Sequence, residues 1–182
     1  MPLRSLTAVA ALALTAAAPA DTLKFTNSGS TVEFVVTKKE VAQPGGFKKF
    51  TGTITLPGGD LGKARLTAEI RTDSLYAQND RLTPLFKSSD VFDVGRFPTA
   101  TLVSTGVRPV RDDSGVTHLL TADLTLHGVT KKVTIPVRFA RTETGLILEG
   151  TFTVQRKEFG MASGEGQLKD DVILRLMLRA GR

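Results

Sequence analysis

Residues 118–139 read HLLTADLTLHGVTKKVTIPVRF, and apolar and polar side chains alternate on both sides of Gly128. Successive side chains of a strand point to opposite faces, so each half of this stretch has one apolar and one polar face. Gly128 stands where the chain must reverse, and glycine accepts a positive φ there. The pattern predicts a β-hairpin in an antiparallel sheet with one face in a core. Pro136 has no N–H to donate, which indicates an edge, a bulge or an interruption at that point.

The same period of two recurs along the rest of the chain. It predicts strands at 31–37, 47–56, 63–75, 99–107, 118–127, 130–141, 145–156 and 171–180, with turns at 43–46 and 57–60 between them. An open sheet of these strands would leave two unpaired edges, whereas a closed barrel leaves none. We therefore predict an all-β fold, an eight-stranded antiparallel β-barrel with a short helical insertion.

The insertion is the segment 76–98, YAQNDRLTPLFKSSDVFDVGRFP, which breaks the alternation. Its apolar residues recur at spacings of three and four, which indicates short helical turns joined by loops. A long connection without a strand is commonly a lid or a binding loop, so we expect this segment to form the mouth of the barrel. Arg81 either meets an anionic headgroup there or pairs with Asp80, Asp90 or Asp93 and fixes the shape of the segment.

The N-terminal residues 1–20 have the pattern of a secretory signal peptide. Arg4 precedes a short apolar run, and Ala18-Pro19-Ala20 precedes the first acidic residue. The run is shorter than the ~20 residues that a membrane-spanning helix needs. We expect cleavage after Ala20, a single domain over 21–182, and a periplasmic or secreted protein. The chain has no cysteine, so burial alone must stabilise it.

Charge gives a weaker indication of partners. Without Arg4, 23 basic and 18 acidic residues give a net charge of +5. The basic residues are scattered along the strands, so they indicate either a solvated polar face or a transient contact with an anionic membrane surface. No aromatic-rich basic motif is present, and we expect no nucleic-acid partner.

The sequence gives little support for catalysis. It contains two histidines, His118 and His127, and lacks a nucleophile-elbow motif and an HExxH motif. The glycine-rich stretch 160–166 does not have the spacing of a phosphate-binding loop. We expect no cofactor, no metal and no enzymatic activity. The alternative is acid/base chemistry on a bound lipid by His127, Asp90 or Arg156.

Five segments in order give the chain a family resemblance. They are Val32-Glu33-Phe34, GGFKKFTG at 45–52, NDRLTPLFKSSDVFDVGRFP at 79–98, DLTLHGVTKKV at 123–133 and RKEFG at 156–160. Together they resemble the YceI-like family, which implies a lipocalin-like barrel that binds a polyisoprenoid or a similar amphiphilic chain. The chain has Thr37-Lys38 and Thr83-Pro84 at two positions where the family usually has a histidine.

A ligand of this kind requires an apolar interior. We predict that Phe34, Val36, Phe50, Leu66, Ile70, Leu124, Leu126, Phe152 and Val154 line it, and that Arg81, Leu85, Phe86, Phe92 and Phe97 lie at its mouth. A cavity too small for a chain would instead favour a packed barrel with a structural or stress-related role. Ile173 and Met177 are predicted to face outward, where they form either a homodimer seam or single surface apolar residues.

Overall fold

The computed structural model describes residues 20–111, 113–161 and 168–182. The predicted signal peptide, apart from Ala20, and most of the glycine-rich stretch 160–166 lie outside the described residues. The described chain has eleven strands and one α-helix, α1 (Thr83–Lys87). The strands are β1 (Ala20–Thr26), β2 (Thr31–Lys38), β3 (Val41–Phe47), β4 (Phe50–Pro57), β5 (Arg65–Arg71), β6 (Leu75–Ala77), β7 (Thr99–Pro109), β8 (His118–Leu126), β9 (Val129–Arg141), β10 (Gly145–Gln155) and β11 (Leu168–Gly181).

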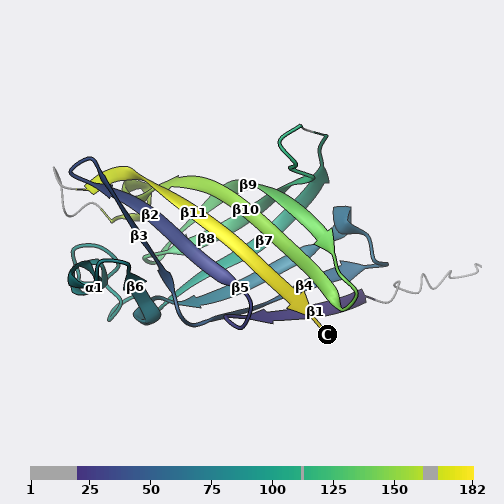
Figure 1. Cartoon of the computed structure of the whole chain (residues 1–182), viewed down its shortest axis with the longest axis horizontal. Coiled ribbons are helices and arrows are strands. Elements are labelled where there is room, and N and C mark those ends of the chain that lie inside the picture. Colours follow the sequence, from purple (N-terminus) through teal and green to yellow (C-terminus); the bar gives the residue numbers. More distant parts are fainter. Residues whose placement is uncertain (1–19, 112, 162–167) are drawn as a thin grey trace, which may run out of the picture.

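Eight of these strands close into a ring. The order is β1-β4-β5-β7-β8-β9-β10-β11, every pair is antiparallel, and Lys24 of β1 lies opposite Gly181 of β11 to complete the circle. Figure 1 shows the strands wrapped obliquely around a common interior. The predicted eight-stranded antiparallel barrel is therefore confirmed.

The other three strands extend the wall at one end of the barrel. β11 has 14 residues, and its first part pairs with β2 while its end meets β1. β2 pairs in turn with β3, and β3 with β6. Figure 1 shows this extension beside α1, at the end of the barrel opposite the C-terminus. The predicted strand at 31–37 thus belongs to the extension, and β1, which was not predicted, takes a place in the ring.

The turn predicted at 43–46 is wrong. These residues lie within β3, and the chain reverses at Lys39 and Glu40 instead, which have φ values of 45° and 65°. Gly45 and Gly46 are needed for close packing rather than for reversal. A Cβ on Gly45 would lie 2.5 Å from Phe34 Cζ, and one on Gly46 would lie 2.8 Å from the Val32 carbonyl oxygen.

The β8–β9 hairpin has the predicted form. His127 and Gly128 make a two-residue turn with φ values of 52° and 74°, the arrangement that matches the twist of the flanking strands. Pairing between β9 and β10 ends at Val137 opposite Gly150, one residue from Pro136. Pro136 therefore marks an interruption of the ladder on the β10 side, because it has no N–H to donate.

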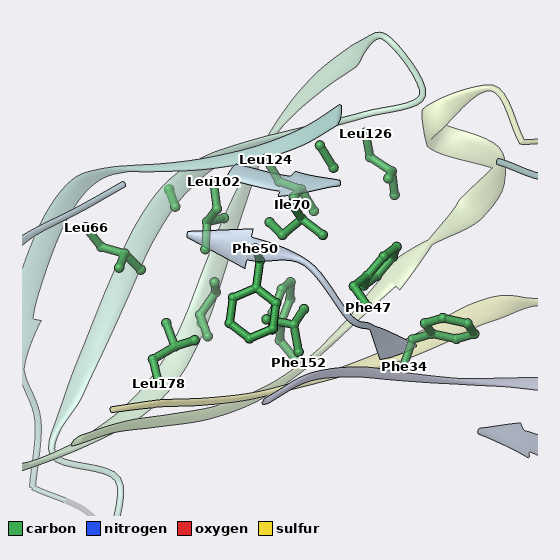
Figure 2. Close-up of a cluster of buried hydrophobic side chains, with 14 of the residues drawn as sticks. Phe34, Phe47, Phe50, Leu66, Ile70, Leu102, Leu124, Leu126, Phe152 and Leu178 are labelled. Carbon is green, nitrogen blue, oxygen red and sulfur yellow. The ribbon is translucent and has the colours of Figure 1, made fainter. Parts of the chain in front are cut away.

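The alternating apolar residues meet inside the ring. Ile54, Ala122, Ile135, Val137 and Leu148 are each fully buried and form the centre of one continuous core. Figure 2 shows Leu66 and Leu178 at one end of this interior and Phe34 and Phe47 at the other. One end of the barrel is thus packed with branched aliphatic side chains, and the other is lined with larger rings.

Candidate ligand-binding site

The interior contains an apolar cavity at the end of the barrel next to α1. Seven strands contribute to its lining: β2, β3, β5, β7, β8, β10 and β11. The rest comes from residues 79–98, which include α1 and are called the α1 segment, and from the short 3₁₀ helix Arg156–Phe159 (η4) with the residues that follow it. The lining residues are Val32, Phe34, Val36, Phe47, Ile70, Phe86, Val91, Phe92, Ala100, Leu102, Leu124, Leu126, Phe152, Val154, Arg156, Met161, Leu168, Val172, Leu174 and Leu176. Within the described chain, Arg156 is the only charged residue among them.

The cavity is narrow in this conformation. The space between the lining atoms totals about 870 Å³, part of it open to solvent, but the centre of a water molecule could occupy only about 80 Å³ of it. For comparison, a dry protein cavity of about 150 Å³ holds one benzene molecule. A long hydrocarbon chain therefore fits only if some of the lining side chains move.

Aromatic side chains close the cavity on the side of α1. The ring of Phe34 lies 5.8 Å from Phe47, 5.8 Å from Phe86 and 6.0 Å from Phe92, and Phe47 lies 5.9 Å from Phe92. These separations are typical of tilted and edge-on ring contacts. We call these four residues the aromatic cluster. It joins the wall strands β2 and β3 to the α1 segment, so movement of that segment would open the cavity.

Arg156 and the rest of η4 form another part of the cavity wall. Arg156 is 2% exposed, and its guanidinium donates hydrogen bonds to the carbonyl oxygens of Lys169, Leu168 and Met161. Phe159 is almost fully buried beside it. Because these guanidinium N–H groups point at backbone carbonyls, Arg156 closes the wall and leaves the cavity surface apolar.

His127 fastens η4 to the β8–β9 turn. Its Nδ1 lies 3.2 Å from the carbonyl oxygen of Phe159, which can only accept, so Nδ1 carries the proton and donates. Its ring packs on Phe97 with 4.3 Å between centroids, and its Nε2 is buried without a hydrogen-bond partner among the described residues. His127 thus holds two segments together.

Nine of the predicted site residues line the cavity: Phe34, Val36, Ile70, Phe86, Phe92, Leu124, Leu126, Phe152 and Val154. Five others lie elsewhere. Phe50 and Leu66 are buried in the core without lining the cavity, and Figure 2 shows Leu66 at the end of the interior away from Phe34 and Phe47. Leu85 is half-buried against the core, and Phe97 packs over Gly128 outside the cavity.

Arg81 is exposed in the 3₁₀ helix Asp80–Leu82, and its backbone N–H is bonded to Asn79 Oδ1. Its side chain forms no ion pair with another described residue, so the predicted pairing with Asp80, Asp90 or Asp93 is wrong. Asp90 and Asp93 lie in turns after α1 rather than on a shared helix face. The structure therefore does not bring them together as a catalytic carboxylate pair.

Sequence reasoning missed Arg156 and Met161 as parts of the cavity wall, as well as the inward residues of β11. The alternation from Phe152 through Val154 reaches Arg156 at the next inward position, but a charged residue is rarely fully buried, so Arg156 was considered only in the acid/base alternative. Val172, Leu174 and Leu176 alternate inward in the predicted strand 171–180 but were not included in the predicted ligand site. Leu168 precedes that predicted strand and was not considered.

The described residues bring together no set of three or more side chains suited to hold a metal ion. His118 and His127 lie at opposite ends of β8. His118 sits edge-on to Phe139 with 5.1 Å between centroids, and burial lowers the pKa of its imidazole despite the opposing charge of Asp60. Across the described part of the chain, no helix is long and apolar enough to cross a bilayer.

This closed antiparallel ring with an enclosed apolar cavity defines a small lipocalin-like barrel protein. The chain belongs to the YceI family: the YceI-like domain model matches residues 23–180. A UPF0312 protein of Pseudomonas fluorescens is 30% identical over 138 residues, which cover 71% of this chain and 70% of that protein. A UPF0312 protein of Pseudomonas putida is 35% identical over 95 residues, which cover 52% of this chain and 48% of that protein.

Solved structures share the fold. BcnA of Burkholderia cenocepacia superposes with a TM-score of 0.76 at 24% identity, covering 86% of this chain and 98% of that chain. A polyisoprenoid-binding domain from Saccharophagus degradans superposes with a TM-score of 0.65 at 14% identity, covering 87% and 97%. At these identities the likeness concerns the fold.

Proposed function

We propose that this protein binds the apolar chain of a lipid inside its barrel and carries or stores it without chemical change. The ligand class is a polyisoprenoid or a comparable amphiphilic chain, such as an isoprenoid quinone, a prenyl phosphate or a fatty acid derivative. The observation that carries the proposal is the cavity, because every described lining residue except Arg156 is apolar and Arg156 directs its guanidinium to backbone carbonyls. One structural neighbour, the domain from Saccharophagus degradans, is a polyisoprenoid-binding domain, which supports this ligand class.

The binding energy of such a ligand comes from burial. Covering ~400 Å² of apolar ligand surface at ~25 cal/mol/Å² would supply ~10 kcal/mol before the costs of association. Among the described residues, the one charged side chain in the lining, Arg156, is directed to backbone carbonyls, so we expect the headgroup to stay at the surface of the barrel. A chain of several isoprene units would displace the aromatic cluster, since the present space admits only a short segment.

Native mass spectrometry of protein purified without detergent tests this proposal. We expect a copurified lipid, or uptake of an added prenyl lipid, quinone or fatty acid at one molecule per barrel. Recovered ligand should be chemically intact. Failure with the whole panel would contradict the proposal, and turnover that is lost in the His127→Ala or Asp90→Ala variant would favour the enzyme alternative.

The small volume of the cavity favours a second candidate, a packed barrel with a structural or stress-related role. The two candidates differ in what happens to the side chains next to α1. A lipid carrier must loosen the aromatic cluster, so added lipid should change hydrogen exchange in residues 79–98. A packed barrel should show the same exchange with and without lipid.

We also propose that the protein is exported to the periplasm or secreted, and that it forms a weak homodimer through the outer face of β11. The basis for export is the sequence of residues 1–20, and β1 begins at Ala20, next to the proposed cleavage point. N-terminal sequencing of protein from the cell envelope or culture medium should give Asp21 as the first residue. A retained Met1 would contradict cleavage.

A further inference from the structure

A hollow on the outer side of α1 is lined by more basic than acidic side chains. Its volume is about 550 Å³, and it is lined by Lys48, Lys49, Asp73, Ser74, Leu75, Tyr76, Asp80, Thr83, Pro84 and Lys87. Three lysines thus face two aspartates in the lining. Arg71 lies next to the hollow and pairs with Asp73 at 2.9 Å, which leaves Asp80 as the one carboxylate not already paired with arginine.

The backbone fixes two of the lysines in place. Lys48 and Lys49 fall between β3 and β4, where Phe47 and Phe50 turn inward and the two lysines turn outward. The N–H of Lys48 donates to the carbonyl oxygen of Ser74, and the N–H of Lys49 donates to Ser74 Oγ. The side chain of Lys48 lies over the ring of Tyr76, 5.5 Å from its centroid.

The charges of the hollow act on one another. The hydrogen bond from Arg71 lowers the pKa of Asp73, and the charges of Arg71, Lys49 and Lys87 lower it further. Within the described chain, neither Lys49 nor Lys87 forms an ion pair. These two ammonium groups are therefore available to an external anion.

The hollow adjoins the α1 segment, which closes the cavity and is called the α1 lid below. Phe86 of α1 belongs to the cavity lining, and the next residue, Lys87, lines the hollow. The same short helix thus presents an apolar side chain to the interior and a cation to the outside. Figure 1 shows α1 and β6 at the same end of the molecule as the β2–β3 hairpin, whose Val41 is 58% exposed.

From this arrangement we infer that the hollow docks on the phosphate groups of an anionic bilayer surface and brings the α1 lid to the membrane from which lipid enters or to which it leaves. Lysine ammonium groups suit phosphate as point charges. Basic side chains close to an anionic surface strengthen association measurably and lose this effect in salt. The inference deepens the proposed lipid-binding function and rests on it.

Vesicle co-sedimentation tests the inference. The wild-type protein should sediment with phosphatidylcholine vesicles that contain anionic phosphatidylglycerol, at low salt, and not with phosphatidylcholine alone. Removing a lysine is expected to lower the partition coefficient about fivefold. The Lys49→Gln/Lys87→Gln variant should therefore bind roughly 25-fold more weakly, while its circular dichroism spectrum stays unchanged.

The matched control is the Lys24→Gln/Arg65→Gln variant, which removes the same charge from exposed positions on β1 and β5. It should bind vesicles as the wild type does. Equal loss in both variants would show that net charge alone acts and would overturn the inference, as would wild-type binding by the Lys49→Gln/Lys87→Gln variant.

Two soluble probes separate this inference from the proposed function. Farnesol uptake should be equal in the wild type and both variants, because the cavity is unchanged. Absence of farnesol uptake in the wild type would count against the cavity as a lipid site, whereas vesicle binding would still report on the hollow. If Lys49 and Lys87 affect the binding of farnesyl phosphate but not of vesicles, bilayer docking is overturned.

Discussion

Gly45 shapes the cavity at the scale of a single atom. A Cβ at this position would lie 2.5 Å from Phe34 Cζ and 2.5 Å from the carbonyl oxygen of Tyr76. The ring can turn aside, but the carbonyl is held in the β3–β6 pairing. We expect Gly45→Ala to lower the free energy of unfolding by about 1–3 kcal/mol and to weaken lipid binding, because Phe34 would be pushed from its place in the lining. Urea denaturation and lipid titration measure the two effects.

Gly52 offers a matched control for this substitution. A Cβ there would lie 2.2 Å from Phe25 Cζ and 2.3 Å from the carbonyl oxygen of Thr67. The clash is similar, but Phe25 does not line the cavity. Gly52→Ala should therefore cost similar stability and leave lipid affinity unchanged. Equal losses of affinity in the two variants would show that Gly45 acts through general stability alone.

Arg156 tests whether the wall of the cavity depends on the shape of a guanidinium. Lysine keeps the charge but cannot reach the carbonyl oxygens of Lys169, Leu168 and Met161 together. We expect Arg156→Lys to lower the free energy of unfolding by about 2 kcal/mol, since buried carbonyls lose charge-assisted hydrogen bonds. Chemical denaturation measures this loss, and a variant as stable as the wild type would show that these bonds contribute little.

His118 gives the protein a pH dependence. Burial lowers the pKa of its imidazole, so the folded protein takes up this proton less readily than the unfolded chain, whose value is about 6.5. The free energy of unfolding should therefore decrease as the pH falls below about 6.5, until the folded imidazole is protonated as well. Between pH 7.5 and 5, the urea midpoint of the wild type should fall more than that of His118→Gln. Parallel curves would show that other groups cause the dependence.

At the scale of elements, side-chain alternation was enough to predict seven strands of the ring and β2 of the extension, but not β1, β3 or β6. Residues 118–139 alternate without interruption, and the structure has β8 and β9 there. β3 was missed because Pro44, Gly45 and Gly46 have the composition of a turn. Their actual role, close approach to Phe34 and Tyr76, depends on residues far away in sequence. β1 was missed because its first residue, Ala20, falls within the predicted signal peptide.

The prediction of the cavity lining had the same strength and the same limit. Residues that alternate inward, such as Leu124 and Phe152, were placed in the interior correctly, but alternation does not tell which end of a barrel is packed and which is open. Phe50 and Leu66 therefore looked equivalent to Phe34 and Val36. The distinction arises from α1 and η4, which cover the cavity from outside the ring.

The α1 segment can be tested as a lid through two of its residues. Phe92 is half-buried in the aromatic cluster, whereas Leu85 packs against the core outside the cavity lining. We expect Phe92→Ala to speed lipid uptake and release several-fold, because the ring closes the cavity. Leu85→Ala should lower stability without changing these rates. Stopped-flow measurements with a fluorescent prenyl lipid check both, and unchanged rates in Phe92→Ala would move the entrance to another part of the barrel.

At the scale of the whole molecule, β11 connects the two parts of the structure. It pairs with β10 along its length, with β2 at its start and with β1 at its end. Its inward residues line the cavity, and its outward residues face solvent next to β2. One strand therefore links barrel closure, the cavity and the surface proposed for self-association.

The proposed dimer follows from the outer face of β11. Ile173 is 36% exposed and lies opposite Val35 of β2, and Met177 is half-buried four residue pairs further along, opposite Thr31. A symmetric dimer would bring the same patch together from both copies. A stable interface buries at least about 1,200 Å², and the charged Arg175 separates these apolar residues, so we expect a dimer that forms only at micromolar concentrations or above.

Sedimentation velocity over a range of concentrations tests this dimer with a matched pair of substitutions. Ile173→Lys should shift the protein to the monomer at every concentration, because it places two like charges at the centre of the symmetric contact. Val103 is a suitable control, since it is 44% exposed on β7, which three strands separate from β11 in the ring. Val103→Lys changes the net charge equally and should leave association unaltered. A wild-type protein that stays monomeric throughout, or equal loss in both variants, would exclude β11 as the dimer surface.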